Sequence, residues 1–144
     1  MHGILKPLEA SAEFVSLAAG LKEKQKQMVF GLSGPQRAYL LAGLVEQAPN
    51  RSFLVLTAGE REAADLGDAI ACFSPGSAIL QFPVMHLLPY QILAQSTEVA
   101  AQRLRVLEIL LRREPGVIIA PVEAMLRCLT PPEQFKAAVL RLAV

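Results

Sequence analysis

The chain has 144 residues, of which 53% are hydrophobic and 19% charged, and its formal net charge is +1. This length suffices for one domain with a hydrophobic core, and the near-neutral charge excludes a global field that would recruit nucleic acid or an anionic membrane. The sequence shows no signal peptide and no apolar run of the roughly 20 residues that span a bilayer, so we expect a cytoplasmic protein. Cys72 and Cys128 lie far apart without metal-ligand spacing, which predicts reduced thiols and no metal site.

The first third of the chain predicts a helix, a strand and a second helix. Apolar residues at helical spacing indicate a helix over about residues 8–21, and the lysine-rich stretch at 22–27 indicates its solvated end. The apolar run "MVFGL", residues 28–32, predicts a buried strand. A helix then begins at Gly34, because the proline that follows loses no hydrogen-bond donor that the first turn needs, and this helix ends before Pro49.

The remaining sequence alternates in the same way. Continuous apolar runs predict strands at residues 52–57, 78–82 and 117–120. Amphipathic patterns predict helices at residues 60–73, 97–113 and 122–129, the first of them with an acidic first turn that suits the helix dipole. Strands that are apolar throughout, alternating with amphipathic helices, predict an α/β fold. We expect a parallel sheet of about four to five strands with helices on both faces.

Two details of this pattern carry separate expectations. The inward face of the helix at 97–113 is expected to hold Ala100, Leu104, Leu107 and Leu111. The apolar loop at 83–96 is expected either to pack on its own sheet or to contact another domain. His86 lies in this loop without a partner at metal-ligand or catalytic spacing.

The stretch "GLSGPQRA", residues 31–38, has the sequence context of a phosphate-binding loop. Such a loop reads G-x-x-x-x-G-K-[ST] between a strand and a helix. Gly31, Ser33 and Gly34 fit a tight turn in that position. The stretch is therefore either a degenerate nucleotide loop or an ordinary strand-to-helix turn, and a weak anion site at the helix N-terminus is a third alternative.

The residues that should bind the nucleotide have been replaced. Gln36 stands where the second glycine is required, and Pro35 has no N–H to donate to a phosphate. Arg37 stands in place of the lysine, and Ala38 lacks the hydroxyl that would hold Mg²⁺. We therefore expect no ATP hydrolysis by this chain and no catalytic residue in it.

Three further residues are candidate contacts to nucleic acid or to a partner. Thr57 lies at a strand-to-helix junction, where helix amides of helicase-type domains meet a nucleic-acid backbone; the alternative is ordinary helix capping. Arg103 and Arg105 belong to the densest basic set of the chain, for which the alternative is a solvated helix face.

Several stretches carry a family resemblance that extends from about Val29 over nearly all of the chain. They include "GLSGPQRAYLLAGL", "LQFPVMHLLPY" and "VIIAPVEAML". These stretches resemble the first domain of the excision-repair protein UvrB. They resemble more closely the UvrB-like N-terminal module of the bacterial transcription-repair coupling factors (Mfd). The resemblance implies a P-loop NTPase/helicase-like (RecA-like) partial domain. It divides the chain into an N-terminal helix with a basic linker (1–27), a UvrB-like domain 1a (28–138) and the start of a truncated segment (139–144).

The resemblance also implies a function. The chain would be a non-catalytic scaffold fragment of transcription-coupled nucleotide excision repair that supports recruitment of UvrA to stalled RNA polymerase. UvrA would bind mostly through an inserted domain that this chain lacks. ATP and Mg²⁺ would be needed only at a motor outside this chain, and DNA contact would be weak or indirect. Other domains of the parent protein would be partners, and the isolated piece is expected to self-associate. The alternatives are a nucleotide-binding P-loop enzyme fragment and a weak, non-specific DNA-binding helicase-like half-domain.

Overall fold

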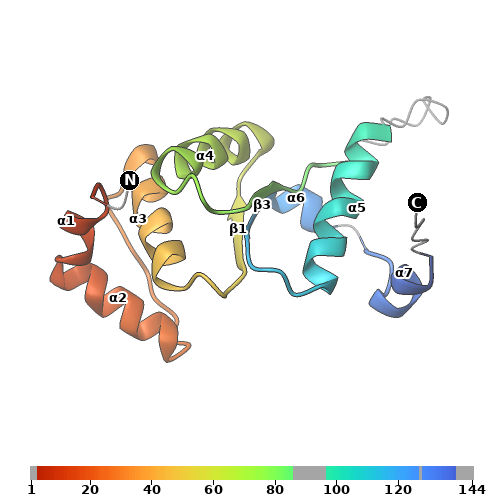
Figure 1. The fold of residues 1–144 in the computed structure, drawn as a ribbon. Helices are drawn as coiled ribbons and strands as arrows, with labels where there is room; N and C mark the ends of the chain where they lie inside the picture. The colour runs from red at the N-terminus through yellow and green to blue at the C-terminus, as the bar shows by residue number, and fades with distance from the viewer. Residues whose placement is uncertain (1–2, 86–96, 127, 139–144) are drawn as a thin grey trace.

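The structure is a computed structural model that describes residues 3–85, 97–126 and 128–138. It is an α/β fold in which a three-stranded parallel sheet is accompanied, in those ranges, by seven helices (Figure 1). The helices are α1 (Lys6–Glu9), α2 (Ala12–Lys22), α3 (Gly34–Gln47), α4 (Glu60–Phe73), α5 (Thr97–Leu111), α6 (Val122–Met125) and α7 (Pro132–Ala138). The strands are β1 (Phe53–Thr57), β2 (Ile79–Gln81) and β3 (Val117–Pro121). The predictions for His86 and for residues 86–96 of its loop, and for 139–144, fall outside the described residues.

β3 is the central strand of the sheet. The strand order is β1-β3-β2, and both pairs of neighbours run parallel. All residues of β1 pair with β3, and β2 pairs with the first part of β3. Every residue of β3 is buried, which explains why this strand is apolar throughout, since a central parallel strand is covered on both faces.

The predicted first strand, residues 28–32, does not form, so the prediction of four to five strands is wrong for the described part of the chain. Met28 and Phe30 are 77% and 78% exposed. No backbone hydrogen bond joins this segment to β1 within the described residues. The residue before the segment is held against α2 instead, because Nε2 of Gln27 donates to the carbonyl oxygen of Leu17 at 2.9 Å. A short apolar run cannot by itself distinguish a strand from an irregular segment.

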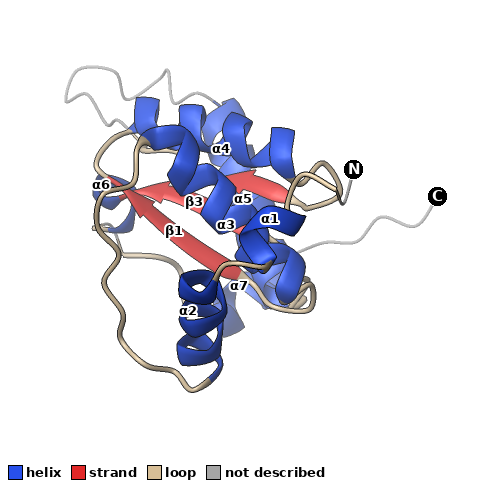
Figure 2. Ribbon diagram, turned by 90° about the vertical axis from the view of Figure 1, so that its left-hand side faces the viewer, coloured by secondary structure: helices blue, strands red, loops and turns tan. Residues whose placement is uncertain are grey.

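Helices cover both faces of the sheet, as the apolar strands predict. α3 and α4 lie on one face, and α5 and α6 lie on the other (Figure 1). α1 and α2 form an outer layer against α3, in front of the sheet in Figure 2. The N-cap of α2 is Ser11, whose hydroxyl accepts a hydrogen bond from the Phe14 amide at 3.3 Å.

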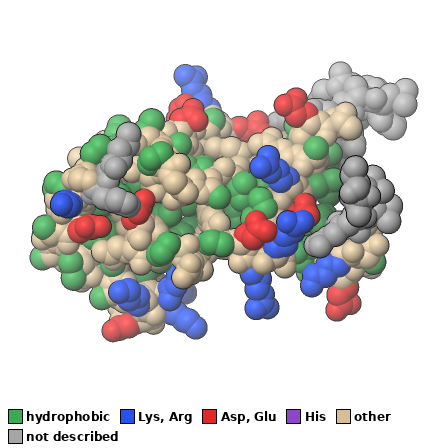
Figure 3. All heavy atoms as spheres, viewed as in Figure 1, with side chains coloured by type: hydrophobic (Ala, Val, Ile, Leu, Met, Phe, Trp, Pro, Cys, Tyr) green, Lys and Arg blue, Asp and Glu red, His purple; other side chains and the backbone are tan. Residues whose placement is uncertain are grey.

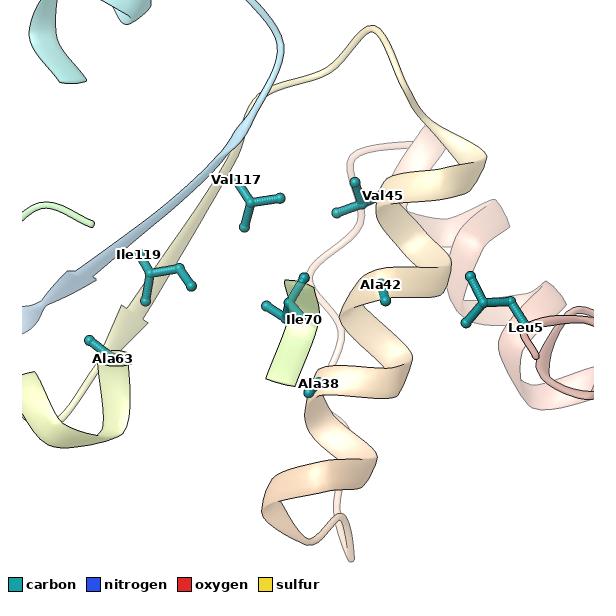
Figure 4. Packing of buried hydrophobic residues seen from close by; sticks show 8 residues of the cluster. All are labelled: Leu5, Ala38, Ala42, Val45, Ala63, Ile70, Val117 and Ile119. Atoms are coloured by element: carbon teal, nitrogen blue, oxygen red, sulfur yellow. The ribbon is translucent and has the colours of Figure 1, made fainter. Parts of the chain in front are cut away.

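The largest core cluster fills the space between α3, α4 and the sheet (Figure 4). Ile70 from α4 and Val117 and Ile119 from β3 are all 0% exposed. Ala38 and Ala42 of α3 are also 0% exposed, and their small side chains let this helix approach its neighbours closely. Leu5 belongs to the same cluster, so the N-terminal helices are packed onto the rest of the described chain. The predicted boundary at residue 27 stays a prediction.

The second face is only partly covered. Its core is formed by Phe82, Val84, Val106, Ile118, Ala120 and Ala124. α5 contacts β2 and α6 contacts β3, whereas Leu54 and Leu56 of β1 are each 54% exposed. The half of this face formed by β1 therefore lacks a covering helix in the described residues.

Two general expectations concern the membrane and the cysteines. Across the described ranges, none of the helices has both the length and the apolar composition that crossing a bilayer requires. Cys72 and Cys128 are exposed free thiols, which agrees with the prediction of reduced cysteines.

Candidate functional site

The degenerate loop lies beside the carboxyl end of β1 and does not follow a strand of its own, although the sequence predicts that it should. Gly31, Leu32 and Arg37 line a groove of about 420 Å³ together with Thr57 at the end of β1 and Glu62 in the first turn of α4. In open α/β sheets, ligands bind outside the carboxyl ends of the strands. The segment that leads into α3 and the junction between β1 and α4 therefore meet at one site, although the first of them does not follow a strand.

The Ser33 amide of the turn is satisfied by the chain itself. Gly31 has a φ of 79°, and Ser33 is the extended N-cap of α3. The side-chain oxygen of Gln36 accepts hydrogen bonds from the Ser33 amide at 2.8 Å and from the Ser33 hydroxyl at 3.0 Å. Pro35, in the first turn, has no N–H. A phosphate would have to displace the glutamine and would still find one donor missing from the row of amides that cradles an anion.

The positive φ at residue 31 gives a first prediction. A residue with a Cβ loses roughly 1–2 kcal/mol in the left-handed region, so Gly31→Ala should lower the free energy of unfolding by about 1 kcal/mol. Urea unfolding measures this value. Gly34→Ala is the matched control, because a Cβ at either glycine meets open space and only Gly31 of the two has positive φ. Equal losses for both variants would contradict the conformational explanation.

Arg37, which stands in place of the P-loop lysine, is held by a carboxylate. Its Nη1 lies 2.8 Å from Oε1 of Glu62, and Oε2 of the same carboxylate accepts a hydrogen bond from the Ala58 amide at 3.0 Å. Glu62 therefore bridges the guanidinium and the backbone at the start of α4. The charge that would attract a phosphate is already paired, and the bridging carboxylate would repel one.

The same bridge predicts a pH dependence. The hydrogen bond from the Ala58 amide, followed by that from Arg37, lowers the pKa of Glu62 below its ordinary value of 4.5. Because the folded pKa is the lower one, the stabilisation is fully present above the unfolded pKa and is lost as pH falls through the folded pKa. The difference in unfolding free energy between the wild type and Glu62→Gln should thus be constant near about pH 6 and shrink below about pH 4. Thermal unfolding over an acid series measures it, and a difference that grew on acidification would contradict the bridge.

Ala38, at the position of the magnesium-binding hydroxyl, belongs to the core. It is 0% exposed and packs in the cluster with Val117 and Ile119. The Ala38 side chain lies on the side of α3 that faces Ile70 of α4 (Figure 4), and Ala38 is not among the residues that line the groove. Nor does the described part of the chain contain a group of three His, Cys, Asp or Glu residues placed to hold a metal ion.

Two of the three predicted contact residues are buried, so the structure does not favour their assignment as nucleic-acid or partner contacts, which stays a prediction. Thr57 is 5% exposed, and its hydroxyl donates to the carbonyl oxygen of Gly59 at 3.1 Å. Arg103 is 6% exposed; its guanidinium carbon lies 3.9 Å from the centre of the Phe82 ring, and its Nη1 donates to the Pro83 carbonyl oxygen at 2.6 Å. Both polar groups serve internal contacts, so neither side chain is placed to reach a nucleic acid.

The predicted inward face of α5 is confirmed at Leu107, which packs against the second core cluster, and is wrong at Leu104. Arg103 and Val106 are the buried residues of this helix, whereas Leu104 is 52% exposed. Arg103 takes an inward position that the apolar pattern does not assign, where the Phe82 ring and the Pro83 carbonyl contact its guanidinium. A pattern that counts only apolar residues does not predict that an arginine side chain is buried on the inward face of a helix.

Arg105 remains exposed, as predicted, and has no ion pair within the described residues. Its neighbour Arg112 pairs with Glu108 at 2.5 Å and with Glu114 at 3.6 Å. On the face shown in Figure 3, basic and acidic side chains lie interspersed. No continuous basic track that would follow a phosphate backbone is visible on this face.

Sequence reasoning missed the two glutamates at the start of α4 as site residues. Glu62 holds Arg37, and Oε1 of Glu60 accepts a hydrogen bond from the Val84 amide at 2.9 Å. The sequence shows only that both lie in an acidic first turn, which the structure confirms. Their partners lie 24 and 25 positions away, and no local pattern predicts such contacts.

Comparisons with known proteins give one consistent relation. The transcription-repair-coupling factor of Bacillus subtilis is 30% identical over 145 residues, which cover 100% of this chain and 12% of that protein. The protein of the same name from Staphylococcus aureus strain USA300 is 25% identical over 109 residues, or 76% of this chain and 9% of the relative. No family model matches the chain. The chain thus spans about an eighth or less of the length of these relatives.

Proposed function

From the homology of this chain to a 145-residue segment of transcription-repair-coupling factor, we propose that it acts as a non-catalytic scaffold in transcription-coupled DNA repair. In this proposal the chain is a UvrB-like domain 1a, a RecA-like unit that supports the recruitment of UvrA to stalled RNA polymerase without hydrolysing ATP. UvrA would bind mainly to a domain outside this chain. ATP and Mg²⁺ would act at a motor elsewhere in the longer protein.

The occupied loop carries this proposal. Glu62 neutralises Arg37 at 2.8 Å, Gln36 occupies the amide of Ser33 at 2.8 Å, and Ala38 faces the core. The first two contacts take up groups that a nucleotide-binding loop leaves free for phosphate, and Ala38 offers no oxygen to magnesium. The contact between Arg37 and Glu62 ties the first turn of α3 to the first turn of α4. Such an arrangement suits a domain that holds its neighbours in place and catalyses no reaction.

The two alternative functions have less support. A nucleotide-binding enzyme fragment would need the ion pair and the glutamine contact to open before phosphate could enter. A DNA-binding half-domain would have to work without Thr57 and Arg103, which are buried, and would depend on Arg105 among the three candidates.

A domain replacement tests the proposal. The homologous segment of the Bacillus subtilis relative is replaced by this chain, and strand-specific repair of ultraviolet lesions in transcribed genes is measured. We expect repair to be retained, and to be unchanged when Arg37→Ala is added, because the guanidinium has a structural partner and no nucleotide. Loss of repair on Arg37→Ala at unchanged thermal stability would argue for nucleotide use. Failure of the unaltered replacement, with the hybrid protein folded, would argue against the scaffold role.

A further inference from the structure

The segment between α2 and α3 runs beside β1 and in the same direction. Lys22, at the end of α2, lines a pocket together with Phe53 at the start of β1. Gly31, further along the segment, lines the groove beside the degenerate loop together with Thr57 at the end of β1. In Figure 2 the loop that leaves α2 leads toward the arrowhead end of β1. The helix between the two, α3, has the length that a crossover between parallel strands requires.

β1 offers this segment a row of backbone groups on its outer edge. Within the described residues β1 pairs only with β3, and the Phe53 amide donates to the Gly116 carbonyl oxygen at 2.8 Å. Because backbone groups along a strand point alternately to its two sides, the amides of Leu54 and Leu56 point away from β3. Proteins protect such an edge with charges, with proline or with a covering segment, and the sequence of β1, "FLVLT", has neither charge nor proline.

Residues 28–30 have the composition and the position to pair with that edge. Val29 and Phe30 already line the groove beside β1, although Phe30 is 78% exposed. Leu32, two positions later, lines the same groove and is half-buried. Side chains two positions apart share one face of a strand, so in an extended segment Phe30 would follow Leu32 into this groove. A strand of three residues does form in this sheet, as β2 shows.

A hydrogen bond to α2 holds the start of the segment. Nε2 of Gln27 donates to the carbonyl oxygen of Leu17 at 2.9 Å. The Gln27 side chain lies so close to α2 that a Cβ added at Gly20 would meet its Nε2 at 2.6 Å. The contact therefore depends on a glycine at position 20, and it fixes the residue from which the apolar segment begins.

We propose that residues 28–30 are a conditional fourth strand, which pairs in parallel with the outer edge of β1 when Gln27 leaves α2. In the paired arrangement Phe30 fills the groove, and the outward amides of β1 gain backbone acceptors. The contact between Gln27 and α2 opposes this pairing, so a change at α2 alters the groove beside the degenerate loop. This inference is independent of the proposed role in repair.

Amide hydrogen exchange of the full chain, measured residue by residue by NMR, tests the proposal. We expect Gln27→Ala to slow exchange of the Leu56 amide by about fivefold, a factor within the range that one hydrogen bond controls. Gly20→Ala should act in the same direction, because its Cβ displaces the Gln27 side chain. The Val55 amide, which points to β3, is the internal reference that corrects for any change in overall stability.

Gln25→Ala is the matched control. It removes a glutamine two positions earlier, whose Nε2 donates to the Glu23 carboxylate at 2.7 Å, and it should leave exchange at Leu56 unchanged. Adding Phe30→Ser to Gln27→Ala should restore fast exchange, because the groove is then left without its aromatic side chain.

Slower exchange at Leu56 in both tether variants, reversed by Phe30→Ser, supports the conditional strand. Wild-type exchange at Leu56 in Gln27→Ala and Gly20→Ala overturns it. An equal effect of Gln25→Ala also overturns it, because the tether would then have no specific part. Slow exchange that persists with Phe30→Ser does the same, since filling of the groove would not drive the pairing.

Discussion

Replacing Arg103 with alanine is expected to lower the free energy of unfolding by about 3 kcal/mol. The truncation removes buried packing and leaves a polar group without its hydrogen-bond donor. The guanidinium lies 3.9 Å from the centre of the Phe82 ring and donates to the Pro83 carbonyl oxygen at 2.6 Å. The variant would lose a desolvated cation–π contact and leave that carbonyl without this donor. Because α5 is joined to the segment after β2 by these contacts, the helix should loosen first.

Arg105→Ala is the matched control for this prediction. It removes the same side chain two positions along α5, where it is exposed, and surface substitutions of this kind change stability by no more than about 0.5 kcal/mol. Urea unfolding of both variants gives the comparison. Similar stabilities for the two would mean that Arg103 is not an internal anchor. Loss of DNA binding with Arg103→Ala at full stability would restore the surface contact that the sequence suggests.

Restoring the hydroxyl of a phosphate-binding loop by Ala38→Thr is expected to destabilise the chain by about 2 kcal/mol, the usual effect of overpacking a core. Ala38 is 0% exposed and belongs to the cluster between α3, α4 and the sheet. The hydroxyl could bond to the helix carbonyl one turn earlier, but the two added heavy atoms would still press against β-branched neighbours. The variant should gain no affinity for ATP with Mg²⁺.

The control for this substitution is Ala64→Thr, in the exposed part of α4. It adds the same atoms to a helix and should lower stability only by the helix-propensity difference of about 0.5 kcal/mol. Thermal and urea unfolding measure both variants. Equal losses of unfolding free energy for Ala38→Thr and Ala64→Thr would mean that the side chain at position 38 has open space around it. That result would contradict the close packing of Ala38 in the core.

Much of the fold could be predicted because apolar periodicity reflects burial. The strands at β1, β2 and β3 and the helices between them lie within a few residues of the predicted positions, and the parallel sheet with helices on both faces is confirmed. The segment "MVFGL" was the main error. Its composition suits a strand, but pairing depends on long-range contacts, and Gln27 ties the residue before it to α2. The local sequence does not show whether this segment pairs with a strand or is held by another contact.

The candidate site was predictable in outline and not in its contacts. Missing P-loop residues at Gln36, Arg37 and Ala38 can be read directly from the sequence. That Glu62 pairs with Arg37 depends on how α3 and α4 pack. The inward turn of Arg103 depends on a ring and a carbonyl from another segment. The same residue types form tertiary contacts and bind ligands. Only the folded structure therefore distinguishes a polar residue in an internal contact from one that is available to a ligand.

The binding of ATP with Mg²⁺, followed by thermal unfolding of the full chain, tests the central claim most directly. A nucleotide at about one hundred times its dissociation constant stabilises a protein by about 2.7 kcal/mol. For a domain of this size that raises the unfolding temperature by at least about 5 °C. We expect no rise with millimolar ATP and Mg²⁺ beyond that produced by Mg²⁺ alone, because Glu62 pairs with Arg37, Gln36 holds the Ser33 amide, and Ala38 faces the core without a hydroxyl for the metal. A rise of several degrees that Arg37→Ala abolishes would contradict this account.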